Sequence, residues 1–393
     1  KKIIINVKKN GDDALINYAK KFDKVDLNKN NFKLNHKLIN INFNIDNNIL
    51  KSFDNAIKNI TRFHKKQLPN DIFLNQNSVK LRSKWQPIDS VGLYIPGGKA
   101  FYPSSLIMNV IPAKIAGVKR IVCVTPPVKD INPYLLTLLK KLKIKETYFV
   151  GGAQAIAALA FGTNQIEPVN KIFGPGNSFV AEAKKQLFGK VGIDLIAGPS
   201  EIVVVANKNN NPEWVAADLM AQAEHDENAQ SILITDDLKF SQLVIKKIDT
   251  LIKNTSKKNI IKKSMKKNGL IILLKDINKC ANIVNFIAPE HLHMHVKSYK
   301  KILPHITNAG GIFLGEYSAE AFGDYIVGTN HVLPTSGSAK FSSGLGVLDF
   351  MKRTSIVEMN TKSFNILSKD TKYMSDIEGL DAHKLSVKIR QSK

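Results

Sequence analysis

Residues 91–125 read VGLYIPGGKAFYPSSLIMNVIPAKIAGVKRIVCVT, and they are the clearest guide to the fold class. A β-rich run, VGLYI, leads into the helix-like stretch SSLIMNVIPAKIAG, and a second β-rich run, RIVCVT, follows it. A strand, a helix and a second strand in this order form a βαβ unit, in which the helix covers one face of a parallel sheet. This stretch therefore predicts a parallel sheet.

The same alternation continues toward the C-terminus. Further β-rich runs such as ETYFVGG, EIVVVA, SILIT and LIILL are separated by helix-like stretches such as AQAIAALAFG and EWVAADLMAQAEHD. Upstream, GDDALINYAKKFD places apolar residues at helical spacing, and a polar helical tail follows the last loops. We therefore expect an α/β protein with two Rossmann-like lobes, each on a parallel sheet, and with helical N-terminal and C-terminal segments.

The chain has 393 residues, which at roughly 150 residues per domain predicts two or three domains. Residues 1–90 are expected to form a mainly helical segment that packs on the second lobe. Residues 91–200 should form the first lobe, and residues 201–346 the second lobe with the catalytic loops. Residues 347–393 should form a C-terminal tail domain.

The charge is the unusual feature of the composition. Lys and Arg number 57 against 33 Asp and Glu, a formal net charge of +24, which invites a nucleic-acid-binding interpretation. Only five of these 57 residues are arginines, however, and the lysines are scattered among Asn and Ile. Proteins that read phosphates and base edges usually favour Arg, because its flat guanidinium makes paired hydrogen bonds. A surface bias toward lysine explains the charge better, so no nucleic-acid partner is expected.

The remaining composition is that of a globular protein. Hydrophobic residues make up 44%, and no apolar run approaches the ~18 residues that suggest a membrane span. The first residues, KKIIINVKK, hold too short an apolar stretch for a signal peptide. Two cysteines, Cys123 and Cys280, are too few for a disulfide scaffold. We expect a cytoplasmic protein without a membrane partner.

Glycines follow three of the predicted strands. They are Gly97 and Gly98 after VGLYIP, the pair in YFVGG, and those in KIFGPGN. Ligands of open α/β sheets bind at the carboxyl ends of strands, where glycine lets the backbone approach closely. Tight strand–helix turns are the alternative, and none of the three is a GxGxxG fingerprint. Three in succession favour a ligand cleft without naming its ligand.

Candidate metal ligands occur in AQAEHDENAQ, where Gln222 and His225 are three residues apart and share a helix face. Imidazole nitrogen is a common metal ligand, and an amide oxygen can complete such a site. The alternative is a solvated helix end, because three acidic residues make the stretch polar. No HExxH motif is present, so a zincin protease is not supported.

The stretch IAPEHLHMH places Glu290 next to His291. A carboxylate and an imidazole side by side can act as a base and a proton relay. His293 and His295 continue with a period of two, so an exposed strand face is the alternative interpretation.

Two later stretches add further candidates. Residues 315–339, GEYSAEAFGDYIVGTNHVLPTSGSA, contain Asp324 and His331 in a long loop of the kind that usually carries function. EGLDAHKLSVKIR places Glu378 and His383 before a helical tail, where surface positions are the simpler explanation. These residues make a candidate site of carboxylates, imidazoles and one amide, but they do not name the substrate.

Eight segments, in order from residue 91 to residue 383, together resemble the histidinol dehydrogenase family. One such motif is weak evidence, whereas eight in the family's order are highly specific. The segments are VGLYIPGGKAFYPSSLIMNVIPAKIAG, FVGGAQAIAALAFGT, KIFGPGNSFVAEAKK, IDLIAGPSEIVVVA, AQAEHD, IAPEHL, NAGGIFLGEYSAEAFGDYIVGTNHVLPTSGSA and EGLDAH.

The resemblance implies an enzyme that oxidises L-histidinol to L-histidine, by way of L-histidinaldehyde, in two NAD-dependent steps at a zinc site. This reaction is the last step of histidine biosynthesis. In the family the metal binds the substrate's imidazole and amine, so its ligands are also substrate-binding positions. The positions that match these ligands are Gln222, His225, Asp324 and His383.

The resemblance also implies roles for single residues. His291 would accept the hydroxyl proton in both oxidations, and Glu290 would help activate the water that attacks the aldehyde. The positions that match substrate contacts are His291, Ser200, His331 and Glu378, and those that match NAD contacts are Tyr94, Gln154 and Asn177.

Enzymes of this family work as homodimers in which the C-terminal segment completes the neighbour's site, so Glu378 and His383 would act across the interface. The nearest alternative is a related zinc- and NAD-dependent dehydrogenase of another small alcohol, and the presence of both His331 and Glu378 favours histidinol. Two further interpretations are a basic nucleic-acid-binding protein and an inactive copy of the enzyme. No recognised nucleic-acid-binding module supports the former, and the intact site residues argue against the latter.

Overall fold

The structure is a computed structural model that describes residues 1–29, 31–39, 41, 43–97 and 102–391. Gly98, one of the glycines considered above, lies outside the described residues. Contacts divide the chain into two compact units, residues 1–67 with 88–350 and residues 68–87 with 351–393.

The first lobe of the larger unit is built on a five-stranded parallel sheet with the order β5-β4-β3-β6-β7. Its strands are β3 (Ser90–Tyr94), β4 (Arg120–Thr125), β5 (Glu146–Phe149), β6 (Lys171–Phe173) and β7 (Gly192–Ile193). Its helices are α4 (Pro103–Ala116), α5 (Pro133–Lys141), α6 (Gly152–Phe161) and α7 (Ser178–Leu187). The strands are nearly all buried, as expected for a parallel sheet with helices on both faces.

The second lobe repeats this arrangement with the order β10-β9-β8-β11-β12, again with parallel pairs. Its strands are β8 (Glu201–Val205), β9 (Gln230–Thr235), β10 (Leu270–Leu273), β11 (His291–Met294) and β12 (Gly311–Leu314). Its helices are α8 (Pro212–Ala223), α9 (Leu238–Leu251), α10 (Lys258–Asn268), α11 (Ala281–Ile287), α12 (Tyr299–Ile302) and α13 (Glu320–Tyr325).

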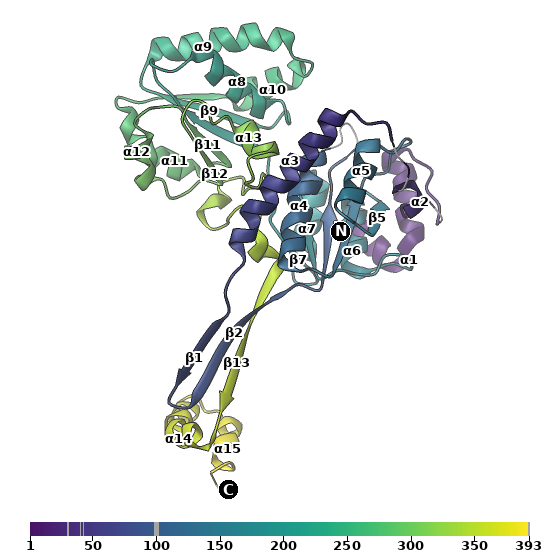
Figure 1. Cartoon of the computed structure of the whole chain (residues 1–393), viewed down its shortest axis with the longest axis vertical. Helices are drawn as coiled ribbons and strands as arrows, with labels where there is room; N and C mark the ends of the chain where they lie inside the picture. The colour runs from purple at the N-terminus through teal and green to yellow at the C-terminus, as the bar shows by residue number, and fades with distance from the viewer. Residues whose placement is uncertain (30, 40, 42, 98–101, 392–393) are drawn as a thin grey trace. The chain divides into compact units, whose positions relative to one another are not determined.

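Alternate side chains of the second sheet build two separate cores. Ile202 and Val204 of β8 pack with α8 and α9, whereas Val203 and Val205 pack with α11 on the other face. Figure 1 shows α8, α9 and α10 on one side of this sheet and α11 and α12 on the other. The prediction of an α/β fold with two Rossmann-like lobes is thus confirmed.

The N-terminal helices are α1 (Lys2–Tyr18), α2 (His36–Ile39) and α3 (Asn47–His64). Helix α1 packs on α6 and α3 packs on α4, both in the first lobe. Helix α3 also reaches the second lobe, where the Asn59 amide donates to the Ile326 carbonyl at 2.9 Å. The expectation that the N-terminal segment packs on the second lobe was therefore wrong for α1, whose apolar face joins the core of the first lobe.

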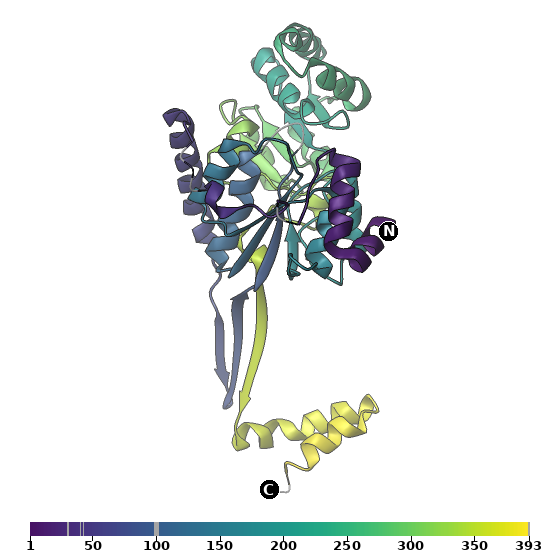
Figure 2. The ribbon, with the colours of Figure 1, turned by 90° about the vertical axis from the view of Figure 1, so that its right-hand side faces the viewer.

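The smaller unit contains an antiparallel sheet with the order β1-β2-β13 and two helices. Its elements are β1 (Ile72–Gln76), β2 (Val79–Pro87), β13 (Met351–Met359), α14 (Thr361–Ile377) and α15 (Asp381–Lys388). Figure 2 shows α14 and α15 as a pair of helices side by side. Helices were expected in these regions of the sequence, and all three strands were missed.

The described helices include none that is both long and apolar enough to cross a membrane. Cys123, in β4, is 1% exposed, and burial raises the pKa of its thiol to about 12. This thiol is therefore an inert part of the first lobe's core.

Candidate active site

The predicted catalytic pair lies at the edge of the second sheet where β8 and β11 begin. Glu290 immediately precedes β11 and His291 is its first residue; they are 7% and 4% exposed. The backbone of the neighbouring strand holds both side chains. The Glu201 N–H donates to Glu290 Oε2 at 2.9 Å, and His291 Nδ1 lies 3.2 Å from the Glu201 carbonyl oxygen. Because a carbonyl oxygen only accepts, this contact places the ring proton of His291 on Nδ1.

The other imidazole nitrogen of His291 faces Asp324 of α13. Nε2 lies 3.7 Å from Asp324 Oδ1 and is buried, with no hydrogen-bond partner among the residues that the structure describes. Burial alone would lower the pKa of His291, but Glu290 and Asp324 outweigh it and raise the pKa well above its ordinary value. Burial likewise opposes ionisation of Asp324, and the nearby His291, His331 and His225 nevertheless lower the pKa of its carboxyl. Asp324 and His291 thus stabilise each other's charged forms: the pKa of the carboxyl is lowered and the pKa of the imidazole is raised.

His331 joins the two lobes at this site. Its Nδ1 lies 3.0 Å from the Asp324 carbonyl oxygen, and its Nε2 lies 3.4 Å from Ser105 Oγ in α4 of the first lobe. Burial lowers the pKa of His331, which favours the neutral ring. Asp324 was expected in a long loop but lies on the short helix α13, whereas His331 lies in the loop after α13. That loop folds back and places His331 beside Asp324.

Gln222, on the last turn of α8, is 1% exposed and lies among carboxylates. With its amide nitrogen toward Glu320 Oε1 at 2.6 Å, its oxygen accepts the Glu201 N–H at 3.0 Å. In the opposite orientation its nitrogen donates to Glu290 Oε2 at 3.3 Å. The first orientation gives both ends of the amide a strong partner, and we prefer it for that reason.

Glu320 and Glu201 are site residues that sequence reasoning missed. Glu320 is 2% exposed, and burial raises its pKa to about 8, assisted by Asp324 and Glu290. Burial also raises the pKa of Glu201, whose Oε1 accepts the Ser336 N–H at 3.0 Å. The four-residue spacing of Glu320 and Asp324, which places them on one helix face, was the available signal for Glu320.

The remaining predicted substrate and metal positions are more dispersed. Ser200 is half-buried directly before Glu201, at the same edge of the sheet, and His225 is exposed just beyond the end of α8. Glu378 ends α14 and His383 lies in α15, both exposed and both in the smaller unit. The structure thus groups Gln222, Asp324 and His331 with the catalytic pair, and the roles of Glu378 and His383 stay predictions.

The predicted NAD contacts lie at the carboxyl edge of the first sheet. Tyr94 ends β3, and its hydroxyl accepts the Gly152 N–H at 3.2 Å at the start of α6, where Gln154 follows. Asn177 caps α7, its side-chain oxygen accepting the Phe179 and Val180 N–H groups at 3.1 Å each. All three residues therefore border the edge at which open α/β sheets bind ligands.

Gly174 shapes this edge. Its φ of 102° lies in the left-handed region, and a Cβ there would approach the Tyr94 carbonyl oxygen to 2.1 Å. A buried ion pair supports it: Lys184 Nζ donates to the Gly174 carbonyl at 3.1 Å and pairs with Asp194, which accepts the Gly174 N–H at 2.7 Å. Only glycine permits this close approach of β6 to β3.

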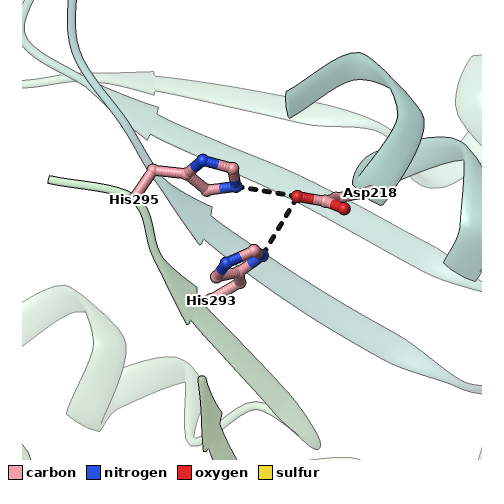
Figure 3. Close-up of side chains that lie close together, drawn as sticks. All are labelled: Asp218, His293 and His295. Atoms are coloured by element: carbon pink, nitrogen blue, oxygen red, sulfur yellow. Dashed lines mark hydrogen bonds and ion pairs between the residues drawn. The ribbon is translucent and has the colours of Figure 1, made fainter. Parts of the chain in front are cut away.

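His293 and His295 are not on an exposed strand face, contrary to that interpretation of the sequence. They are 0% and 2% exposed and point toward Asp218 of α8 (Figure 3). Asp218 was not singled out in the sequence. The strand face is covered because α8 packs over β8 and β9 and its Asp218 contacts both histidines, which the histidine spacing alone does not indicate.

Comparison with known proteins identifies the family. A family model described as histidinol dehydrogenase matches residues 1–391. Histidinol dehydrogenases from Rhizobium meliloti (strain 1021) and Rhodospirillum rubrum are each 47% identical to this chain; the matches cover 99% and 100% of it and 90% and 91% of the relatives. A crystal structure of histidinol dehydrogenase from Elizabethkingia anophelis superposes with a TM-score of 0.94 at 37% identity, covering 100% of this chain and 91% of that one. The chain belongs to the histidinol dehydrogenase family.

Proposed function

We propose that this protein oxidises L-histidinol to L-histidine through L-histidinaldehyde and reduces two NAD⁺ in the process. The observation that carries the proposal is the buried pair Glu290–His291, with Asp324, His331 and Gln222 packed around it at one sheet edge. A base, a second carboxylate and polar substrate contacts are the groups that an alcohol and then an aldehyde oxidation require.

His291 is the proposed base. With its proton on Nδ1, held by the Glu201 carbonyl, its Nε2 presents a lone pair in the site. Nε2 takes the hydroxyl proton of histidinol while the carbinol hydrogen leaves as hydride. NAD⁺ would supply the hydride acceptor, and Tyr94, Gln154 and Asn177 would contact it at the edge of the first sheet.

Glu290 is the proposed base of the second half-reaction. Its carboxylate lies 3.6 Å from His291 Nδ1, and Glu290 is 7% exposed. A water molecule bound beside this carboxylate would therefore be largely shielded from bulk solvent. Glu290 takes a proton from this water as its oxygen adds to the aldehyde. After its first proton has passed to solvent, His291 takes the hydroxyl proton of the hydrated aldehyde as the second hydride leaves.

The residues fit a zinc ion. Four carboxyl groups gather in this region, those of Glu201, Glu290, Glu320 and Asp324. After burial, the charges of Asp324 and Glu290 contribute to the raised pKa of Glu320, and that of Glu290 to the raised pKa of Glu201. A divalent cation would compensate this charge. Gln222, His225 and Asp324 would hold it, because an amide oxygen with two lone pairs can bind a metal while accepting the Glu201 N–H. Zinc would supply the anchor for the substrate's imidazole and amine.

The remaining contacts are proposed to come from Ser200, His331 and a second copy of the chain. Glu378 and His383 would reach the neighbour's site in a homodimer, His383 as the fourth zinc ligand. The family's pattern supports this arrangement, in which a monomer lacks part of the site.

A steady-state assay with L-histidinol and NAD⁺ tests the proposal. We expect NADH formation that a chelator abolishes and that added Zn²⁺ restores. Zinc-loaded dimeric protein that fails to turn over histidinol would refute it. His383→Asn is a matched variant outside the larger unit: it should weaken zinc retention, which metal analysis after dialysis measures.

A further inference from the structure

A second group of polar side chains lies on the same helix and strand as the candidate active site. Asp218 belongs to α8. His293 lies in β11, and His295 is the first residue after that strand. One possible ligand atom of each lies within 4.8 Å of the others, and the three side chains converge in Figure 3. None of them has a role in the reaction proposed above.

The contacts of His293 call for a positive charge, which either a second ring proton or a metal ion can supply. Its Nε2 lies 3.0 Å from the carbonyl oxygen of Gly315, which only accepts, so Nε2 carries the proton of a neutral ring. Nδ1 then presents a lone pair, yet it lies 3.0 Å from Asp218 Oδ2 without the alignment of a hydrogen bond. Two electron-rich atoms in such contact repel each other unless a proton or a metal ion lies between them.

His295 converges on the same oxygen. Its Nε2 lies 2.7 Å from Asp218 Oδ2, and its buried Nδ1 has no hydrogen-bond partner among the described residues. A tetrahedral ion about 2.0–2.2 Å from imidazole nitrogens and a carboxylate oxygen holds those atoms roughly 3.3–3.6 Å apart, each lone pair directed at the ion. The missing alignment at His293 fits this arrangement. The separations of 3.0 Å and 2.7 Å from Asp218 Oδ2 are shorter, the second being that of a hydrogen bond, so the Asp218 carboxylate would move back by several tenths of an ångström to admit the ion.

We propose that Asp218, His293 and His295 bind a divalent transition metal ion, Zn²⁺ being the ion that suits this ligand set. The Gly315 carbonyl fixes the tautomer of His293, as the second contact of a metal-bound imidazole usually does. The two imidazoles are buried, and the Asp218 side chain is 12% exposed. The partly exposed Asp218 would leave room for a water as a further ligand.

The ion would tie α8 to β11. Asp218 and Gln222 are four residues apart on α8, a rise of about 6 Å, and His291 and His293 share one face of β11. The same two elements therefore carry both sites. Binding of the ion rests only on the triad, whereas its consequence, keeping Gln222 opposite Glu290 and His291, rests on the proposed function.

Metal content after loading with Zn²⁺ and dialysis is the direct test. We expect two Zn²⁺ per chain in the wild-type dimer and one in Asp218→Asn. If wild type holds one Zn²⁺ per chain and Asp218→Asn holds none, the result would support the metal site at Asp218, His293 and His295. The same result would refute the zinc proposed for the active site. Equal content in wild type and Asp218→Asn would overturn the present proposal and leave the active-site zinc standing.

His295→Gln provides a second variant in case Asp218→Asn does not fold, which circular dichroism would show. It should also lose one Zn²⁺ per chain. The competing explanation is that His293 and Asp218 share a proton instead of a metal ion. Tm is therefore measured with Zn²⁺ and with chelator, in wild type and in His383→Asn. If neither addition changes Tm in either protein, the shared proton is the better explanation and the proposal is refuted.

Tryptophan fluorescence gives a local readout. The chain has two tryptophans, Trp85 and Trp214, and Trp214 lies one helical turn before Asp218 and 5.5 Å, centroid to centroid, from Tyr317. In Trp85→Phe only Trp214 emits, and Co²⁺ should quench it. In the Trp85→Phe, Asp218→Asn double variant the quenching should fall by most of its amplitude; undiminished quenching would contradict the proposal.

Discussion

The two lobes share one strand order but carry their polar groups at opposite edges. In the first lobe, Tyr94, Gln154 and Asn177 lie where the strands end, and in the second, Glu290 and His291 lie where β11 begins. The general rule for open α/β sheets places ligands at carboxyl ends, and it accounts for the first lobe alone. In the second lobe the candidate site lies instead at the edge where β8 and β11 begin, because the acidic residues Glu201 and Glu290 are at least partly buried there.

Replacing the base should have the largest effect. His291→Asn removes the imidazole but keeps a polar side chain, so kcat should fall by ~10²–10⁴-fold. The carboxyl edge of the first lobe should be unaffected, and the Kd for NAD⁺ should stay within a factor of two or so of wild type. Near-normal turnover would remove His291 from the mechanism, and a large loss of NAD⁺ affinity would mean that the two edges are not separate.

The pH dependence of turnover should show the same base. Glu290 and Asp324 raise the pKa of His291, and a base works only when unprotonated, so kcat should rise with pH through a value above the ordinary histidine range. Glu290→Gln removes one of the two charges and should move this rise to lower pH. If the pH profile of Glu290→Gln matched that of wild type, the charge of Glu290 would not be raising the pKa of His291.

Stability should depend on pH through Glu320. Burial raises its folded pKa from 4.5 to about 8, so its neutral form is favoured in the folded state. The associated stability is fully present below pH 4.5 and is lost as pH rises to about 8. Urea unfolding should therefore show that Glu320→Gln destabilises the metal-free protein less at about pH 9 than at about pH 5. An equal effect at both pH values would contradict the buried, protonated state.

The smallest effect is expected at the first lobe's edge. Asn177→Ala removes the cap of α7 and should cost about 1 kcal/mol in unfolding free energy. Asn177→Asp keeps an accepting oxygen and serves as the control. If Asn177 also contacts NAD⁺, both variants should raise the KM for NAD⁺, and only Ala should lower stability; an unchanged KM in both would leave Asn177 a helix cap alone.

The two lobes were predicted well from the sequence because each strand–helix unit is local in the chain. Prediction failed for β2 and β13, which pair across more than 260 residues and whose side chains are largely exposed on both faces. Such strands lack the buried alternation that marks a strand in a sequence.

The candidate site was predictable to a similar extent. Motif order identified Gln222, Glu290, His291, Asp324 and His331, which the structure brings to one place. Asp218, Glu201 and Glu320 were missed because most carboxylates are solvated, and their burial depends on how α8, α13 and β8 meet. The four-residue spacings Asp218–Gln222 and Glu320–Asp324 were the local signals for two of them.

The central claim is that one buried edge of the second sheet performs both oxidations, with Glu290 needed for the second. The yield of NADH per L-histidinol consumed tests this most directly, measured to completion with wild type and with Glu290→Gln. We expect two NADH for wild type and a value falling toward one for Glu290→Gln, with L-histidinaldehyde accumulating. Two NADH at an unchanged rate from Glu290→Gln, or one from wild type, would contradict it.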